Sequence, residues 1–469
     1  MRCISVDIGS TYTKGALFDF EKGALTLLGR AGTLTTREDL SAGFLTCIDT
    51  LDAQCGTGRD RAGKGGGLLG SGVPVLISSS ARGGLSIAAI GLVPSATMKM
   101  AKSTAISAGG RVTRAFSYKL TGEDITNLES DPPDILLFAG GTDGGDEIYV
   151  RHNTRMLAAS SLSSSIIFCG NRAMKEEVGS ILAGKELSLA ANILPELGRP
   201  EPEEARAAIR EIFLRRIVSG KGLDRIIGMT GSEVLPTPLA MFEYVKLLGA
   251  HNPAWRNYCV IDMGGATTDF YSTLEDPSGT PGVVFRGLPE PASSRTVEGD
   301  LGMRINAHNL FDPAGDFLVG RARETGIAAD EIRQYTEKLH RAPGSLPGSE
   351  REVLIEEILA AACVATAAER HAGRRERIFT AGGEVLLQTG RDLSGVEKVI
   401  GTGGYLARMP GRFPALRRVD ERGSEILLPE RAEYYRDSEY LFPLLANAAR
   451  SYPGAAAACG ISSLVRDES

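Results

Sequence analysis

The chain has 469 residues and a formal net charge of −6, so it is too long for one compact core and too evenly charged to predict binding to nucleic acid or an acidic membrane. Its seven cysteines include no Cys-x-x-Cys pair, and no stretch approaches 18 uninterrupted apolar residues, which argues against a disulfide or zinc framework and against a membrane span. Met1-Arg2-Cys3 leads into a predicted strand rather than a signal peptide, and these features together predict a cytoplasmic protein.

The first predicted elements are two strands joined by a glycine turn. Cys3–Val6 form the first strand and Gly15–Phe18 the second, with Asp7-Ile8-Gly9-Ser10-Thr11-Tyr12-Thr13-Lys14 between them. A helix is predicted after residue 40, where apolar residues recur at helical spacing. The glycine-rich segment 56–72 follows no strand and opens no helix, so it is predicted to be a flexible loop rather than a nucleotide loop.

Strands and helices alternate between residues 73 and 170, which predicts a Rossmann-like βαβ insert. The buried strand 135–138 ends in Ala139-Gly140-Gly141-Thr142-Asp143-Gly144-Gly145. Such a turn fits a ligand site or a tight strand-to-helix connection equally well. The insert as a whole is a candidate region for holding a partner protein or a substrate.

Residues 172–250 are predicted to be mainly helical. Glu203–Val218 reads as an amphipathic helix whose charges form a solvated face. Glu233 precedes a helix start at Pro236–Ala240, and its carboxylate is a candidate general base.

A second strand–turn–strand unit spans Tyr258–Tyr271. Its turn, Asp262-Met263-Gly264-Gly265-Ala266-Thr267-Thr268-Asp269, matches the N-terminal turn in pattern, and Asp262 lies 255 residues after Asp7. Adjacent glycines bring backbone N–H groups close to an anion, and threonine hydroxyls can bond phosphate oxygens. A carboxylate beside a phosphate repels it unless a cation lies between them, which makes Asp262 a candidate Mg²⁺ ligand. A single such unit is equally well explained as an ordinary hairpin, whereas the pair predicts two similar domains that face one ligand.

The remaining predicted elements, from residue 295 onward, are helices, strands and a glycine turn. The segment Arg295–Gly302 leads into a helix, and its acids Glu298 and Asp300 either cap that helix or lie near the ligand. A helix is predicted at 351–371, a strand around 377–387, and a terminal helix from about 438 to 449. Between them, Val399-Ile400-Gly401-Thr402-Gly403-Gly404-Tyr405-Leu406 predicts a strand, a glycine turn and a helix.

The two turns resemble the phosphate-1 and phosphate-2 loops of the actin-like ATPase superfamily, and Val399–Leu406 resembles its adenosine loop. The resemblance implies two ribonuclease-H-like α/β domains around a nucleotide cleft. The first is expected at 1–255, with the insert at 73–170, and the second at 256–437, with the C-terminal helix 438–469 returning to the first. ATP and Mg²⁺ are the implied ligands, with the metal held by Asp7 and Asp262. The implied nucleotide-binding residues are Gly9, Ser10, Thr11, Tyr12, Thr13 and Lys14; Gly264, Gly265, Ala266, Thr267 and Thr268; and Gly401, Thr402, Gly403 and Gly404.

Within this superfamily, the same turns together with Phe138–Gly145 and Arg295–Gly302 resemble the MutL-like (GlmL) glutamate mutase accessory family, which is unrelated to mismatch repair. The resemblance implies an ATP-driven reactivating chaperone whose client is an adenosylcobalamin-dependent mutase. Hydrolysis would be activated by a carboxylate, with Asp7 and Glu233 as candidates beside Asp262. A small-molecule kinase and a nucleotide-binding scaffold without turnover are the alternatives, and a homodimer is left open.

Overall fold

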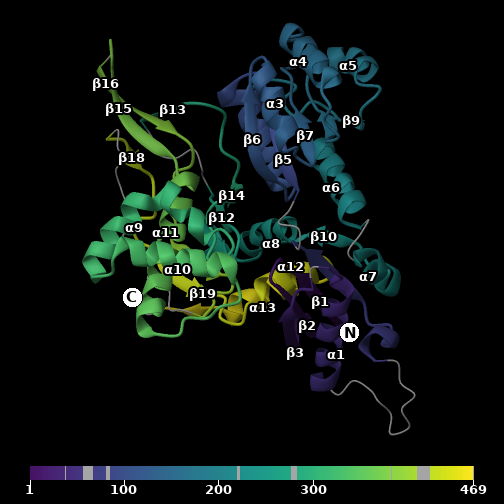
Figure 1. Cartoon of the computed structure of the whole chain (residues 1–469), viewed down its shortest axis with the longest axis vertical. Helices are drawn as coiled ribbons and strands as arrows, with labels where there is room; N and C mark the ends of the chain where they lie inside the picture. Colours follow the sequence, from purple (N-terminus) through teal and green to yellow (C-terminus); the bar gives the residue numbers. More distant parts are fainter. Residues whose placement is uncertain are drawn as a thin grey trace. The chain divides into compact units, whose positions relative to one another are not determined.

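The structure is a computed structural model that describes residues 1–36, 38–55, 67–80, 85–218, 222–275, 282–381, 383–408 and 423–467 (Figure 1). The chain divides into two compact units. Unit 1 comprises residues 1–81, 226–286 and 290–469, and unit 2 comprises residues 82–225 and 287–289.

Unit 1 contains a five-stranded sheet with the order β10-β4-β1-β2-β3. Its strands are β1 (Arg2–Ile8), β2 (Tyr12–Glu21), β3 (Ala24–Leu34), β4 (Val75–Ser79) and β10 (Val234–Pro236). The first three strands form an antiparallel meander, and β4 and β10 run parallel to β1. This is the strand order of a ribonuclease-H-like sheet, as the sequence predicts.

A second sheet of unit 1 repeats this order as β14-β12-β11-β17-β19, with β20 added at one edge. Its strands are β11 (Tyr258–Met263), β12 (Thr268–Thr273), β14 (Ser293–Glu298), β17 (Lys398–Thr402), β19 (Glu433–Arg436) and β20 (Val465–Arg466). Again the first three are antiparallel, and β17 and β19 run parallel to β11. Unit 1 therefore contains two α/β sheets with the same strand order, which agrees with the predicted α/β fold class.

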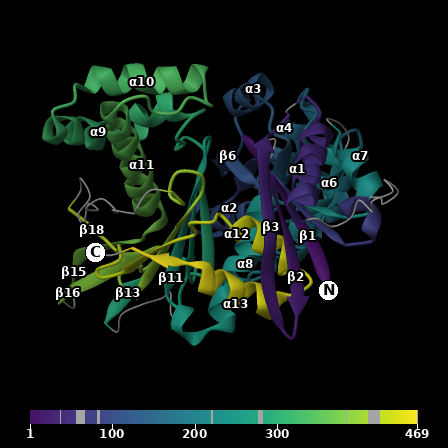
Figure 2. The ribbon, with the colours of Figure 1, turned by 90° about the horizontal axis from the view of Figure 1, so that it is seen from below.

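Helices cover both sheets of unit 1 (Figure 2). The helices α8 (Thr237–His251), α12 (Phe442–Ala448) and α13 (Pro453–Ser463) share one apolar core with side chains of both sheets, including Phe18 and Tyr271. The far face of the second sheet packs on α9 (Phe311–Thr325), α10 (Ala329–Arg341) and α11 (Glu350–His371). The remaining helical segments of unit 1 are α1 (Leu40–Cys55), η1 (Leu68–Ser71), η4 (Pro253–Trp255) and η5 (Ala307–Leu310).

The C-terminal segment returns to the first sheet after it leaves β19. Ser5 Oγ donates to Leu444 O at 2.7 Å, and Asn447 Nδ2 donates to Val6 O at 3.0 Å. Both hydrogen bonds are buried and join α12 to β1, although more than 430 residues separate the partners in sequence.

A smaller sheet of unit 1 corrects one prediction. It has the order β13-β16-β15-β18, with the strands β13 (Val283–Phe285), β15 (Arg374–Thr380), β16 (Gly383–Thr389) and β18 (Glu425–Ile426). The single strand predicted around 377–387 is two strands, because β15 and β16 pair antiparallel from Thr380 with Gly383 to Arg374 with Thr389.

Unit 2 is a parallel five-stranded sheet with the order β6-β5-β7-β8-β9 (Figure 1). Its strands are β5 (Ser86–Gly91), β6 (Arg111–Ser117), β7 (Ile135–Phe138), β8 (Ser165–Phe168) and β9 (Leu187–Leu189). Its helical segments are η2 (Pro94–Met98), α2 (Lys99–Ser107), α3 (Gly122–Ser130), α4 (Ile148–Ala159), η3 (Arg172–Met174), α5 (Lys175–Ile181) and α6 (Glu203–Val218), and α7 (Leu223–Thr230) follows.

The Rossmann-like character predicted for this region is present, but the predicted limits of 73–170 need correction. Residues 75–79 form β4 of the first sheet of unit 1, where they pair with β1. The insert extends to residue 225 because β9 and α6 complete its sheet and cover one of its faces.

Two other sequence-based expectations can be placed. Residues 56–66 of the glycine-rich segment 56–72 lie outside the described residues. Among the described residues, no helix combines the length and the apolar character that crossing a membrane requires.

Candidate functional site

The two predicted turns of unit 1 have the same backbone structure. Gly9 N donates to Tyr12 O at 3.0 Å, and in the second hairpin Gly264 N donates to Thr267 O at 2.9 Å. The strand registers also correspond, since Ile8 pairs with Thr13 and Met263 with Thr268. The sequence repeat is therefore a structural repeat.

The tips of these turns approach each other. A Cβ atom built on Gly265 would lie 3.5 Å from Thr11 Oγ1 and 3.4 Å from Arg304 Cβ. The adenosine-type loop also contacts the second hairpin: Gly403 has a φ of +96°, and a Cβ there would lie 2.2 Å from Met263 O. Glycine is required at Gly403 both by backbone conformation and by space.

Asp7 is the second-last residue of β1 and is almost fully buried. Its Oδ1 accepts hydrogen bonds from Thr237 Oγ1 at 2.6 Å and from Ser78 Oγ at 3.1 Å. Burial raises the pKa of Asp7, and these two hydrogen bonds act in the opposite direction. Among the described residues both bonds fall on the same oxygen, so Oδ2 is the atom available to a ligand.

Asp262 occupies the equivalent position in β11 and has a different electrostatic environment. Burial and the carboxylate of Asp269, its cross-strand neighbour, raise the pKa of Asp262 to about 7. Asp269 is itself paired with Arg295, whose Nη2 lies 3.1 Å from Asp269 Oδ1. In the first hairpin the residue at the position of Asp269 is a lysine, Lys14, which pairs with Asp7.

Lys14 lies close enough to the aspartates Asp7, Asp262 and Asp437 to be influenced by their charges. Burial lowers the pKa of this lysine to about 8, and Asp7, Asp262 and Asp437 oppose that shift. Its Nζ lies 3.1 Å from the centroid of the Tyr440 ring, a cation–π contact. The ammonium therefore lies over the Tyr440 ring and within the electrostatic influence of these aspartates.

Asp437 was not predicted from sequence. It follows β19, is fully buried, and accepts hydrogen bonds from Thr402 Oγ1 at 2.9 Å and from the backbone N of Leu441 and Phe442 at 2.7 and 2.9 Å. It thus caps α12 and fixes the end of β17 with one carboxylate. The only sequence signal for it is an aspartate a few residues before a predicted apolar helix.

The predicted phosphate-binding residues divide into two groups. The hydroxyls of Thr13 and Thr268 are engaged within the protein, with Thr35 Oγ1 at 3.1 Å and Leu301 O at 2.9 Å respectively, and Thr402 donates to Asp437. The residues at the turn tips keep partial or full exposure: Ser10, Thr11, Tyr12, Gly264, Gly265, Ala266 and Thr267.

Glu233 is not brought together with the aspartates. It precedes β10, its side chain is 45% exposed, and Arg450 Nη2 lies 3.1 Å from its Oε2. Because β10 is parallel to β4 with Leu235 beside Ser78, the residue that reaches Asp7 is Thr237, beyond the carboxyl end of the strand. In the described part of the chain, no contact joins Glu233 to Asp7 or Asp262.

The structure also locates Glu298, the last residue of β14, and Asp300, which follows the strand. Glu298 and Asp300 both bind Arg370, whose Nη1 lies 2.6 Å from Glu298 Oε2 and 2.8 Å from Asp300 Oδ1. This arrangement ties β14 to α11, so the contacts of these two acids are structural.

Comparison with known proteins shows the family. The sequence matches the MutL protein family over residues 3–464. Protein MutL of Clostridium tetanomorphum is 35% identical over 457 residues, which is 96% of each chain.

Two solved structures are similar at low identity. Xylulose kinase from Bifidobacterium adolescentis is 12% identical with a TM-score of 0.31, and the match covers 100% of this chain and 96% of that one. Diol dehydratase-reactivating factor in nucleotide-free form is 10% identical with a TM-score of 0.28, covering 86% and 92%. Likenesses of this size carry no argument about function. The full-length match and the curated relative do settle membership: the chain belongs to the MutL protein family.

Proposed function

We propose that this protein is a Mg²⁺-dependent ATPase that serves an adenosylcobalamin-dependent mutase, of the glutamate mutase or aminomutase type, as a reactivating chaperone. The observation that carries the nucleotide part is the facing pair of glycine turns with the same backbone hydrogen bond, each preceded by an aspartate at the second-last position of a strand, Asp7 in β1 or Asp262 in β11. Backbone N–H groups at such tips suit phosphate oxygens. The adenosine side would be bounded by the Gly401–Gly404 loop, which contacts the second turn through Gly403.

The residues present fit a hydrated Mg²⁺ ion. The described residues contain no cluster of three or more His, Cys, Asp or Glu side chains that would enclose a metal directly. Mg²⁺ commonly keeps several waters and uses one or two carboxylates together with nucleotide phosphates. Asp7 and Asp262 would hold it through its water shell, which leaves Asp7 Oδ2 able to accept a proton, and when bound it would neutralise charge on the phosphate oxygens.

Other side chains of this site would act on the substrate. The Lys14 ammonium, which lies among Asp7, Asp262 and Asp437, is positioned to contact a phosphate oxygen. Asp7 Oδ2 would orient an attacking water molecule and accept its proton, while Thr237 and Ser78 fix the carboxylate through Oδ1. Because Glu233 forms an ion pair with Arg450, Asp7 is the better candidate for the general base.

The client part of the proposal rests on membership of the MutL family and on the accessory role that the family resemblance implies. Two similar α/β sheets that share one layer of helices are suited to a change in their mutual angle between nucleotide states. Such a change is how ATP turnover would act on a bound client.

The test is calorimetric titration of ATP with and without Mg²⁺, together with phosphate release. Without Mg²⁺, wild-type protein is expected to bind ATP only weakly. With Mg²⁺, it is expected to hydrolyse ATP slowly. Asp7→Ala and Asp262→Ala should abolish turnover, whereas Asp49→Ala, on the exposed side of α1, should leave it unchanged. Absence of adenine nucleotide binding by the wild type would refute the proposal. Phosphorylation of a small hydroxyl compound would instead favour the kinase, and tight binding without turnover would favour the scaffold.

A further inference from the structure

The carboxyl edge of the parallel sheet in unit 2 carries an unusual set of exposed apolar side chains. Within the described residues of this unit, the large hydrophobic side chains with marked exposure all follow or end a strand at this edge. They are Val93 (44%), Tyr118 (54%), Ile148 (67%), Leu189 (48%) and Leu197 (75%). Because β5 to β9 are all parallel, their carboxyl ends lie on one side of the sheet. Five exposed apolar side chains that share one end of the sheet make this end a candidate interaction surface.

Tyr118 is held at this edge in a conformation that costs energy. Its φ is +65°, which bulky L residues rarely adopt. Asn153, fully buried on α4, fixes the turn by donating from Nδ2 to Tyr118 O at 2.8 Å and accepting from Leu120 N at 2.8 Å. The fold therefore stabilises a strained backbone while leaving more than half of the tyrosine exposed, which packing alone does not explain.

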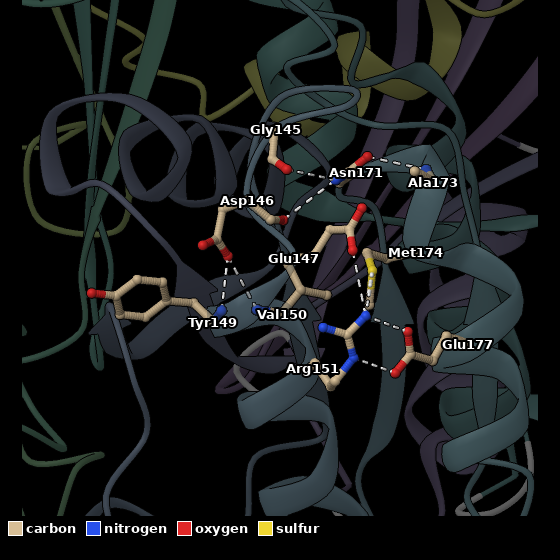
Figure 3. Close-up of polar contacts among 10 residues, drawn as sticks. All are labelled: Gly145, Asp146, Glu147, Tyr149, Val150, Arg151, Asn171, Ala173, Met174 and Glu177. Carbon is tan, nitrogen blue, oxygen red and sulfur yellow. Dashed lines mark hydrogen bonds and ion pairs between the residues drawn. The ribbon is translucent and has the colours of Figure 1, made fainter.

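The loops that form the rest of the edge are fixed by buried amides. Asn171 Oδ1 accepts from Gly144 N at 3.0 Å. Its Nδ2 contacts Gly145 O and Asp146 O at 3.4 and 3.3 Å (Figure 3). Asn192 Nδ2 donates to Asp143 Oδ1 at 2.8 Å, which ties the segment after β9 to the loop after β7. A surface that is already ordered loses little conformational entropy when a partner binds.

The glycine turn 139–145 does not fit an anionic ligand. Asp146 Oδ2 accepts from Tyr149 N at 2.9 Å and so occupies the start of α4 with a negative charge. Glycine is needed for close packing instead, since a Cβ on Gly170 would lie 2.2 Å from Gly140 N and one on Gly140 would lie 2.6 Å from Val150 Cγ2. Of the two interpretations open from sequence, the tight strand-to-helix connection is the one that these contacts favour.

The charge of the loops at this edge limits the class of partner that can bind there. The loops at this edge (residues 92–94, 118–124, 139–148, 169–176 and 190–201) contain eight acidic and four basic side chains. Some are paired, such as Arg151 with Glu147 and Glu177 beside the edge (Figure 3). A net negative rim disfavours nucleic acid and anionic lipid and suits a protein with basic residues around an apolar patch.

We propose that this edge of unit 2 is the surface on which the client protein docks, through an apolar patch with a basic rim that the client presents. This inference rests on the proposed function, because it identifies where the chaperone would hold its client. Tyr118 would be the main anchor of the contact, since aromatic side chains are enriched among the residues that contribute most binding energy in interfaces, and Ile148 would add apolar area.

The test measures binding of the adenosylcobalamin-dependent mutase purified from the same organism, by biolayer interferometry in the presence of ATP and Mg²⁺. Ile148→Asp and Leu197→Asp should each weaken binding by roughly tenfold or more. The matched control is Leu346→Asp, because Leu346 is 73% exposed in unit 1 and should tolerate the change with no loss of affinity. Glu196→Lys should weaken binding at low salt and flatten its salt dependence.

Each alternative outcome overturns the docking proposal in a distinct way. Equal binding by all variants would place the client elsewhere while leaving the proposed function intact. A wild-type protein that binds ATP but no mutase would refute the client role itself. Concentration-dependent dimerisation abolished by Ile148→Asp would show that a second copy covers the edge. A melting temperature lowered by Ile148→Asp but not by Leu346→Asp would show that Ile148 is packed within the folded chain.

Discussion

The Nζ of Lys14 lies 3.1 Å from the centroid of the Tyr440 ring, and this contact joins the first hairpin to the segment between β19 and α12. Tyr440 adopts a φ of +51°, and its backbone N donates to Asp437 O at 2.9 Å. The ring is thus held over the ammonium by a backbone conformation that a bulky residue rarely adopts. The position of the Lys14 side chain, on the first sheet, therefore depends on Tyr440, which follows β19 of the second sheet.

Replacement of Tyr440 tests that contact. Tyr440→Ala removes the ring and should lower the free energy of unfolding by roughly 1–2 kcal/mol, the range for a partly desolvated cation–π pair. Tyr440→Phe keeps the ring and should match the wild type within about 0.5 kcal/mol. Urea denaturation followed by circular dichroism measures both. Equal losses for the two variants would mean that the hydroxyl, rather than the ring, stabilises this region.

Substitution of Asp437 should reveal its double role as a helix cap and a partner of Thr402. Asp437→Asn retains the shape but presents an amide N–H to donors, and loss of a charge-assisted buried hydrogen bond costs about 1.5–3 kcal/mol. Thr402→Val should cost about 1 kcal/mol. Because they share a hydrogen bond, the double variant should lose clearly less than the sum of the single losses. Additive losses in the same thermal unfolding experiments would show that the two residues act independently.

Two adjacent glycines provide a matched pair in the adenosine-type loop. Gly403→Ala combines a φ of +96° with a Cβ that would lie 2.2 Å from Met263 O, so the turn must shift. It should destabilise the protein by roughly 2 kcal/mol or more and weaken ATP binding. Gly404→Ala meets open space at a backbone conformation that alanine tolerates, and should change neither quantity. The contact with the second hairpin would be unimportant if Gly403→Ala bound ATP like the wild type.

His371 makes the stability of the second sheet dependent on pH. It is buried between Ser272 Oγ at 2.7 Å and Thr296 Oγ1 at 3.0 Å, and burial, with the nearby Arg391 guanidinium, holds the pKa of His371 well below its usual value near 6.5. The unfolded chain therefore binds a proton that the folded chain does not once the pH falls below about 6.5. Stability contributed by the neutral ring is complete above that pH and is lost as the pH decreases, by up to about 1.4 kcal/mol per pH unit.

The measurement for this prediction is the free energy of unfolding at pH 7.5 and pH 5.5. His371→Asn should be less stable at pH 7.5 but should show a smaller decrease between the two values than the wild type. Parallel decreases in both proteins would assign the acid sensitivity to carboxylates instead.

The features that sequence predicts best are those encoded locally. Asp7 and Asp262 each lie at the second-last position of a strand before a glycine turn, so the duplicated hairpins follow from neighbouring residues. Asp437 could not be predicted in the same way, because its partner Thr402 lies 35 residues away and the contact depends on parallel pairing of β17 with β19. The prediction that Glu233 lies near Asp7 is affected in the opposite way. Glu233 is close to Thr237 in sequence, but Glu233 precedes β10 whereas Thr237 follows β10 and reaches Asp7.

The return of α12 to β1 has a consequence for synthesis of the chain. Ser5 and Val6 find their partners Leu444 and Asn447 only after nearly the entire polypeptide has left the ribosome. Domains usually fold in order from the N-terminus as they emerge, but here the apolar face of the earliest strands lacks part of its covering until the last helices are made. The part of this face that α12 and α13 cover therefore stays uncovered until residues 442–463 have been synthesised.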